Sequence, residues 1–535
     1  MYTLSIIKTM NTHKIYNLLF AALSVTALTT SCDDYLDKLP DDRAEVNTIE
    51  KAKSLLTSAY TLHTPDYIME YSSDNVTDNG RQYTSQPNQD QLYRWQDVET
   101  EGNDDPRTYW STSYTAVGTA NEALSALSKL GDGAEVKELR AEGLLCRAWD
   151  MFRLSNVFCM AYNPEKADSL LGLPYPTEPN VSVDERGSLK QLYENINKDI
   201  EEALPLVGDA HLTVPKYHFN TKAAYAFAAR FNLFYHNYDK AIEYATKALG
   251  NDPSSVLRQT AAYDELAGVD DIGNAWIKSS EPANLMLQPA TSTLGRSFLS
   301  SSYARYATNR EITTYETYWA RTPWSPNGGS TNNTLYESHM LYGNDRQVYM
   351  PKMMEIFEVT DKINETGYPH IVDAVLTGDE TLLVRAEAYV MKGEYDKALA
   401  DMNSWVVAHT AAMTGTATRP TLTVDNINSF INGLTVAPSN PTSGVQRTMR
   451  KVLHPQGFSL KDETQTNLIL MVLQMRRVET WQQGQRFMDL KRWGIEFAHS
   501  LDGEDALIFK AGDKRGAIQI PSDVVDAGLE PNPRD

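Results

Sequence analysis

Apolar residues recur every three or four positions along most of the chain, and strand-like alternation is rare. This spacing places apolar side chains on one face of an α-helix, so the pattern predicts a mainly α-helical protein. One short string occurs twice: YDKA stands at 238–241 in NLFYHNYDKAIEYATKALGNDP and at 395–398 in VRAEAYVMKGEYDKALADMNSW. Each copy follows one helix-length stretch with alanines on one face and leads into another, which indicates a repeated pair of helices.

These pairs have the residue pattern of a tetratricopeptide repeat, in which small residues let two helices approach closely and a bulky residue precedes the turn. The first copy supplies Ala229, Tyr238, Ala241, Ala248 and Pro253, and the second supplies Ala386, Tyr389, Gly393, Tyr395 and Ala398. We therefore predict that Ala241 and Ala398 are buried against the preceding helix. The string RAE, at 140–142 and 385–387, indicates a third related helix, and 51–64 gives a weaker fourth. Helical repeats offer surfaces for binding and bring no catalytic groups of their own.

The N-terminal pattern is that of an export signal. A basic start precedes a 14-residue apolar run, Ile15–Leu28, which ends shortly before Cys32 and the acidic pair Asp33 and Asp34. The run is too short to cross a bilayer, so residues 1–31 are predicted to be a secretory signal peptide. We predict that Cys32 is lipidated as in a bacterial lipoprotein, although Leu28 stands four positions before it, one more than the usual spacing. The alternative is a soluble secreted protein with a chance cysteine.

Charge and cysteine content narrow the function classes. The net charge of −21 argues against nucleic acid as a partner and against adsorption to anionic headgroups, so contact with a membrane is expected through the lipid alone. Cys146 and Cys159 fall in one predicted helix, about 20 Å apart, and are therefore expected to be buried thiols without a disulfide. About 500 residues remain after the signal, which predicts two packed lobes.

Aromatic residues gather where the sequence becomes polar and turn-rich. Between Tyr303 and Tyr349, nine of 47 residues are Tyr or Trp, and such a segment cannot bury that many rings in a core. A sugar packs its C–H face on a ring and offers hydroxyls to polar partners. Two windows supply the candidate ligand-binding residues: Asp74, Arg81, Tyr83 and Trp95 in the first, and Tyr315, Trp319, Trp324 and Asn327 in the second. For each ring the alternative is packing in the core, which is the interpretation given to Trp110 and Tyr114.

Catalytic signatures are not found. No nucleophile elbow, phosphate-binding loop or zinc-protease motif occurs, and SDN at 73–75 lacks the companion motifs of a penicillin-binding site. We therefore expect no catalytic residues, no metal and no cofactor. Asp74, Asp78, Asp104 and Asp105 are interpreted as solvated loop charges. A surface hydrolase remains the rival hypothesis, and it requires two carboxylates converging in a cleft, one with a raised pKa.

Together these segments resemble the SusD/RagB family, the outer-membrane nutrient-binding lipoproteins of Bacteroidetes. The segments that carry the resemblance are CDDYLD from Cys32, LRAEGLLCRAWDMFRLSNVF, the two YDKA helix pairs, MRRVETWQQGQRFMDLKRWG and the closing AIQIPSDVV. In the fourth of these we expect ion pairs between helices around Gly484, formed by Arg476, Glu479, Arg486, Asp489 and Arg492.

The resemblance implies a tetratricopeptide-repeat-like helical superhelix packed against an irregular, loop-rich lobe. It divides the chain into residues 32–250 and 251–535, with a ligand-binding insert at about 264–375. It also implies a glycan-binding protein without enzyme activity that faces the cell exterior and works with a SusC-like TonB-dependent transporter. Peptide binding, as in the RagB branch, is the alternative. Asp33 and Asp34 resemble the signal that sends such lipoproteins to the outer face of the outer membrane.

Overall fold

The computed structural model of the chain describes residues 46–179, 185–299, 303–325, 335–411 and 419–534. The predicted signal peptide at 1–31, the lipidation site Cys32 and the candidate Asn327 lie outside the described residues. Residues from Thr48 onward form one compact unit, so the expected boundary between 250 and 251 stays a prediction. Among the described residues no helix is both long enough and apolar enough to cross a membrane.

Helices form most of the regular structure, which confirms the mainly α-helical prediction. The longer ones are α3 (Ile49–Leu56), α6 (Pro106–Leu127), α7 (Ala134–Phe158), α8 (Leu189–Ala203), α9 (Thr221–Phe234), α10 (Tyr238–Leu249), α12 (Val269–Trp276), α15 (Gly378–Lys392), α16 (Tyr395–His409), α17 (Val424–Asn432), α18 (Glu463–Glu479) and α19 (Gln485–Trp493). Shorter turns of helix are α4 (Asp66–Tyr71), α5 (Pro87–Tyr93), α11 (Ala261–Asp264), α13 (Leu294–Leu299), α14 (Arg310–Tyr315) and α20 (Ser522–Asp526).

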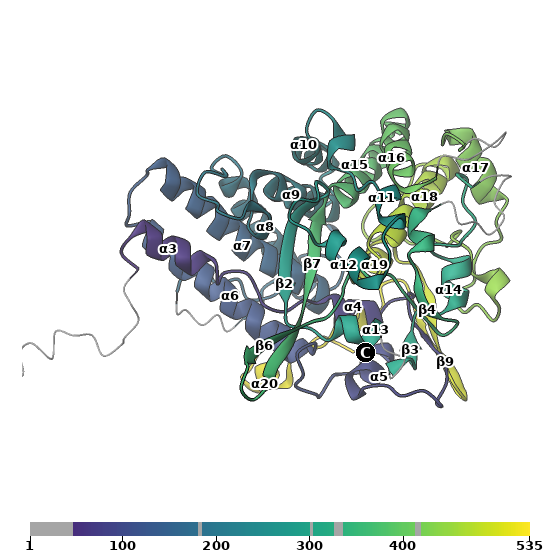
Figure 1. The fold of residues 1–535 in the computed structure, drawn as a ribbon, viewed down its shortest axis with the longest axis horizontal. Helices are drawn as coiled ribbons and strands as arrows, with labels where there is room; N and C mark the ends of the chain where they lie inside the picture. The colour runs from purple at the N-terminus through teal and green to yellow at the C-terminus, as the bar shows by residue number, and fades with distance from the viewer. Residues whose placement is uncertain (1–45, 180–184, 300–302, 326–334, 412–418, 535) are drawn as a thin grey trace, which may run out of the picture. The chain divides into compact units, whose positions relative to one another are not determined.

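The two YDKA strings open equivalent second helices, α10 and α16, each directly after the first helix of its pair. Ala241 and Ala398 are both fully buried, as predicted. Gly393 ends α15 with a left-handed backbone (φ 76°), which supplies the sharp turn that a residue with a Cβ rarely adopts. The two pairs also pack on each other, because α10 lies against α15 (Figure 1).

The RAE helix expected at the third position is α7, which packs between α6 and α8. Cys146 and Cys159 are buried free thiols in and at the end of α7, as predicted. Trp110 on α6 is buried and Tyr114 half-buried, and their rings lie 4.9 Å apart between centroids. The weaker repeat helix over 51–64 is shorter than expected, because α3 ends at Leu56.

The sheets are small and antiparallel. A three-stranded sheet has the order β2 (Asn284–Ala290), β7 (Thr366–Thr377), β6 (Ile356–Asp361). Three further pairs are β1 (Thr77–Asp78) with β3 (Tyr306–Ala307), β4 (Tyr342–Asn344) with β5 (Gln347–Tyr349), and β8 (Phe497–Leu501) with β9 (Glu504–Phe509). Strand β7 runs straight into α15, and Thr377 caps that helix by accepting a hydrogen bond from the Glu380 amide (3.1 Å). The three-stranded sheet thus continues directly into the second repeat pair through β7.

Buried ion pairs join α15, α18 and α19, and they confirm the sequence prediction in part, because Glu479 faces His409 and Arg486 pairs with Asp74, which both lie outside these three helices. Arg476 pairs with Asp489 (3.0 Å), and Arg492 pairs with both Asp489 (2.8 Å) and Glu387 (2.6 Å). Gly484, between α18 and α19, has a left-handed backbone (φ 70°). Breaking such a buried pair strands an uncompensated charge, so these contacts hold the helices in one arrangement.

Candidate ligand-binding surface

Tyr83 lies half-buried in the loop between β1 and α5, beneath the guanidinium of Arg346. The Tyr83 amide donates to the Gly80 carbonyl (3.1 Å), which closes a turn at Gly80 (φ 112°). Arg346 belongs to the turn between β4 and β5, and its guanidinium carbon lies 5.0 Å from the centroid of the Tyr83 ring. Asn79 fixes loop and turn together, because its amide donates to the Arg346 carbonyl (2.7 Å).

Trp319 lies just after α14 and is half-buried beneath a second guanidinium, that of Arg310 at 5.5 Å from its ring centroid. Asn309 caps α14 by accepting a hydrogen bond from the Ile312 amide (3.0 Å). The Arg310 side chain pairs with Asp345 (3.1 Å), and the Arg310 amide donates to the Asp345 carbonyl (2.9 Å). Asp345 precedes Arg346 in the same turn, so one two-residue segment connects both rings.

These five side chains, Tyr83, Arg310, Trp319, Asp345 and Arg346, are called here the aromatic-arginine surface. Arg310 and Asp345 are 65% and 78% exposed, and an exposed ion pair is worth only about 0–1 kcal/mol. Arg310 and Asp345 can therefore give up their mutual contact and bind a ligand at little cost in free energy. When a guanidinium moves aside, the ring beneath it can accept the apolar C–H face of a sugar, and the guanidiniums and the carboxylate can bind the hydroxyls, so the surface matches the needs of a sugar. One candidate ring from each sequence window, Tyr83 and Trp319, thus belongs to this surface.

Arg81 and Tyr315 are accessible but have other neighbours. Arg81 is exposed and its guanidinium pairs with Glu504 of β9 (2.8 Å). Tyr315 at the end of α14 is 37% exposed, and its ring covers Gly444, where an added Cβ would lie 2.3 Å from a ring carbon. Ligand binding by these two residues stays a prediction.

Trp95 and Trp324 do not stand at a surface as predicted, because both rings are buried. Trp95 donates through Nε1 to the Ser72 carbonyl (2.9 Å) and stacks on His499 of β8 at 4.3 Å between ring centroids. Trp324 is 0% exposed and lies edge-on to Trp405 of α16 at 5.8 Å. The packing partners come from remote parts of the chain, which is why local polarity misplaced these two rings.

The prediction that Asp74 is a solvated loop charge is also wrong, because its carboxylate is buried. It accepts two hydrogen bonds from Arg486 (2.7 and 2.8 Å) and lies 3.4 Å from Arg477. Burial opposes its charge, but the two guanidiniums outweigh burial and hold the pKa of Asp74 well below its usual range. Asp104 and Asp105 are buried too, and the Asp78 side chain is 1% exposed beside Arg305, so the interpretation as solvated loop charges is wrong for all four.

One group of side chains in the described chain could hold a metal ion: Asp379, His409 and Glu479, with donor atoms within 4.8 Å of one another and all buried. His409 contacts Glu337 through Nδ1 and Asp379 through Nε2 (3.1 Å). Burial lowers the pKa of His409, but the Glu337 carboxylate and the hydrogen bonds outweigh burial and raise that pKa well above its usual value. A protonated imidazole between carboxylates satisfies this cluster, which we interpret as an ion cluster of the core.

Carboxyls with raised pKa values lie in the interior. Burial raises the pKa of Glu70 to about 7, and burial together with the Asp379 charge raises that of Glu479 to about 7. Glu70 is 0% exposed and is held by the amides of Gln482 and Gly484. Neither carboxyl belongs to the aromatic-arginine surface.

Sequence reasoning missed the two arginines and Asp345. It ranked rings by their surroundings in the sequence, whereas Arg310 and Arg346 matter because tertiary structure places their guanidiniums on those rings. A usable signal was present, since GND at 343–345 is turn-forming sequence directly before Arg346.

Comparison with family models matches two long segments. A model described as "Starch-binding associating with outer membrane" matches residues 34–233, and one described as "SusD family" matches residues 297–519. No curated protein matches the chain.

Solved structures share the fold over nearly the whole chain. A putative sugar binding protein from Bacteroides vulgatus ATCC 8482 is 17% identical, with 92% of this chain and 99% of that chain covered and a TM-score of 0.62. A SusD superfamily protein from Bacteroides thetaiotaomicron VPI-5482 is 18% identical, with 91% and 100% covered and a TM-score of 0.60. A laminarin binding SusD-like protein is 15% identical, with 91% and 98% covered and a TM-score of 0.52.

Proposed function

The chain belongs to the SusD/RagB family, and we propose that it is a cell-surface lipoprotein that binds an oligosaccharide or polysaccharide for import. The partner in this proposal is a SusC-like TonB-dependent transporter of the outer membrane, to which the protein delivers its ligand. The family-model description that mentions starch and the outer membrane supports this proposal, as does the similarity to a putative sugar binding protein and to a laminarin binding SusD-like protein.

The observation that carries the proposal is the aromatic-arginine surface. Tyr83 and Trp319 are 236 positions apart in the sequence, yet the β4–β5 turn connects them, because its Arg346 lies over Tyr83 and its Asp345 pairs with Arg310, which lies over Trp319. Trp and Tyr faces bind the apolar side of a pyranose, and the neighbouring guanidiniums and carboxylate bind its hydroxyls. A flexible glycan is therefore expected to lie along this turn.

Binding to a panel of soluble glycans and peptides, with released reducing ends monitored, tests the proposal. Stacking on one ring is worth on the order of 1 kcal/mol, so Tyr83→Ala and Trp319→Ala should each weaken binding of the identified glycan about fivefold. The double variant should lose nearly all of a weak interaction.

The matched control is Tyr225→Ala, which removes a half-buried ring of α9 beneath Lys247 (5.1 Å). It should bind the glycan as the unmodified protein does. If Tyr83→Ala and Trp319→Ala also bind normally while folded, the ligand platform lies elsewhere. Release of reducing ends would favour the rival hydrolase.

Peptide binding is the second candidate, because exposed Arg310 and Arg346 can also take peptide carboxylates. The same panel separates the two ligand classes. If a peptide binds, is displaced by no glycan of the panel and binds more weakly to Arg346→Gln, the peptide would replace the glycan in the proposal.

Membrane attachment is proposed to depend on the lipid at Cys32, with Asp33 and Asp34 directing the protein to the outer face. Cys32→Ala should move the protein out of the outer-membrane fraction in cells that lack the transporter. Retention in that fraction would contradict the anchor. Replacing both aspartates with Ala should keep the anchor and reduce digestion by protease added to intact cells, and unchanged digestion would contradict the sorting role.

A further inference from the structure

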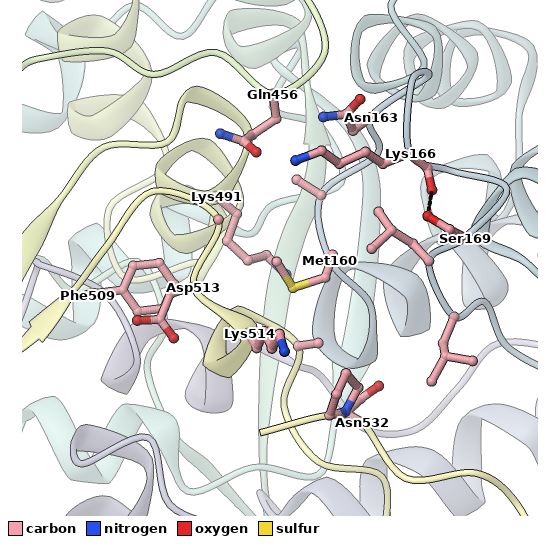
Figure 2. A pocket seen from close by; sticks show the side chains of 16 residues that line it. Met160, Asn163, Lys166, Ser169, Gln456, Lys491, Phe509, Asp513, Lys514 and Asn532 are labelled. Carbon is pink, nitrogen blue, oxygen red and sulfur yellow. Dashed lines mark hydrogen bonds between the residues drawn. The ribbon is translucent and has the colours of Figure 1, made fainter. Parts of the chain in front are cut away.

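A cavity of about 220 Å³ lies between the segment that follows α7 and the C-terminal segment after β9 (Figure 2). Residues 160–171 form one side, residues 509–517 with 532–533 form the other, and Lys491 of α19 lies across the interior. The aromatic-arginine surface contributes no residue to it. Its size is below that of a drug-binding pocket, which corresponds to a ligand of about ten non-hydrogen atoms.

The wall of the cavity is mainly apolar. Met160, Leu170, Leu171, Phe509 and Pro533 contribute hydrocarbon and sulfur surface, and Phe509 belongs to the ring cluster around Trp95. An apolar group that fills this space removes that surface from water, which favours binding by roughly 25 cal/mol per Å² buried.

The buried polar groups of the wall already have partners within the protein. The Lys491 ammonium donates to three backbone carbonyls, those of Asn156 (2.5 Å), Cys159 (3.1 Å) and Gly516 (2.9 Å). Burial lowers the pKa of Lys491 to about 7, so this ammonium adds only part of a positive charge near neutral pH. The Asn532 amide donates to the carbonyls of Phe158 (3.0 Å) and Ile518 (2.7 Å). Because these polar groups are already satisfied, the interior favours an apolar ligand group.

The rim carries unpaired positive charge. Lys166 and Lys514 are exposed, and within the described chain neither ammonium has an acceptor. The rim carboxylate, Asp513, is paired with Arg515 (2.7 Å) and does not neutralise the lysines. Figure 2 shows Lys166 and Lys514 reaching the cavity from different segments.

We propose that this cavity is a second binding site, for a small aromatic carboxylate whose ring enters the apolar interior and whose carboxylate stays at the rim, in the positive field of Lys166 and Lys514. The ring fits the volume, and the two ammonium groups attract a carboxylate at the rim without neutralising each other. The site is independent of the glycan surface, so a failure of the glycan proposal leaves it unaffected.

Titration of the purified protein with phenylacetate, followed by ligand-observed NMR, tests the site. A ligand of this size should bind with a millimolar or lower Kd, and phenylacetamide, which has the same shape without the charge, should bind at least about fivefold more weakly. Lys166→Gln and Lys514→Gln should each weaken phenylacetate binding about threefold, because exposed charge pairs contribute modestly. Lys510→Gln makes the same charge change on an exposed lysine that does not line the cavity, and it should have no effect.

Filling the cavity provides a second test. Ala161 is half-buried in the wall, and Ala161→Phe should abolish phenylacetate binding without changing the melting temperature. If that variant does not fold, the double variant of Lys166 and Lys514 to Gln decides, because surface lysines rarely affect folding. Absence of saturable phenylacetate binding up to about 10 mM overturns the proposal. Equal affinity for phenylacetamide, or unchanged affinity in folded Ala161→Phe or in the double variant, overturns it as well.

Discussion

Replacing Trp324 tests whether this aromatic residue of the loop-rich region packs in the core or binds a ligand. Its ring is 0% exposed and lies edge-on to Trp405 at 5.8 Å, while Trp405 stacks on His409 at 4.3 Å. No acceptor within the described chain takes the indole N–H of Trp324. Among the described residues, replacing Trp324 with Ala thus removes packing and no hydrogen bond.

The cost of Trp324→Ala follows from that packing. A fully buried Trp removes roughly 200 Å² from water, which at about 25 cal/mol per Å² gives about 5 kcal/mol, and measured losses for Trp in a core are about 3–5 kcal/mol. For a unit of this size the melting temperature should fall by about 3–10 °C. Urea unfolding followed by circular dichroism measures the same loss in free energy.

Trp319→Ala is the matched comparison, because the same residue type is only half-buried there and lies under Arg310. We expect it to change the unfolding free energy by less than about 1 kcal/mol. The opposite pattern would refute the assignment: a Trp324→Ala protein that melts with the unmodified protein but loses its glycan would place Trp324 at the ligand.

Two further predictions concern packing and protonation. Ala398→Leu should destabilise the second repeat by about 1–3 kcal/mol through overpacking. Ala400→Leu, on the exposed side of the same helix, should not destabilise it. Equal urea midpoints for the two variants would contradict the repeat assignment. Burial opposes the charge of Glu142, but hydrogen bonds with His211 (2.8 Å) and His218 (2.7 Å) outweigh burial and lower the pKa of Glu142 to about 2. The stability it adds, about 3 kcal/mol at most, is therefore present above pH 4.5 and lost as the pH falls toward 2. In urea unfolding measured from pH 5 to pH 2.5, Glu142→Gln should reduce the loss of unfolding free energy as the pH falls. A loss equal to that of the unmodified protein would contradict this role of Glu142.

Helix positions and repeat packing were predictable because their determinants are local. The spacing of small and bulky residues around Tyr238 and Tyr395 specifies two helix pairs, and Ala241 and Ala398 are buried as that spacing requires. The ion pairs of Arg476 and Arg492 were predictable for a similar reason, since their partner Asp489 lies within 13 positions.

The candidate surface was predictable only in part. The sequence by itself placed aromatic residues in two polar windows and so named Tyr83 and Trp319, but it could not separate them from Trp95 and Trp324. Burial of a ring depends on the residues that cover it, and His499 covers Trp95 from 404 positions away. Only the tertiary structure buries Asp74 beneath Arg486 and brings Arg346 onto Tyr83, because those contacts join segments hundreds of residues apart. Arg310 lies only nine positions before Trp319, but its contact with that ring depends on how the chain folds after α14.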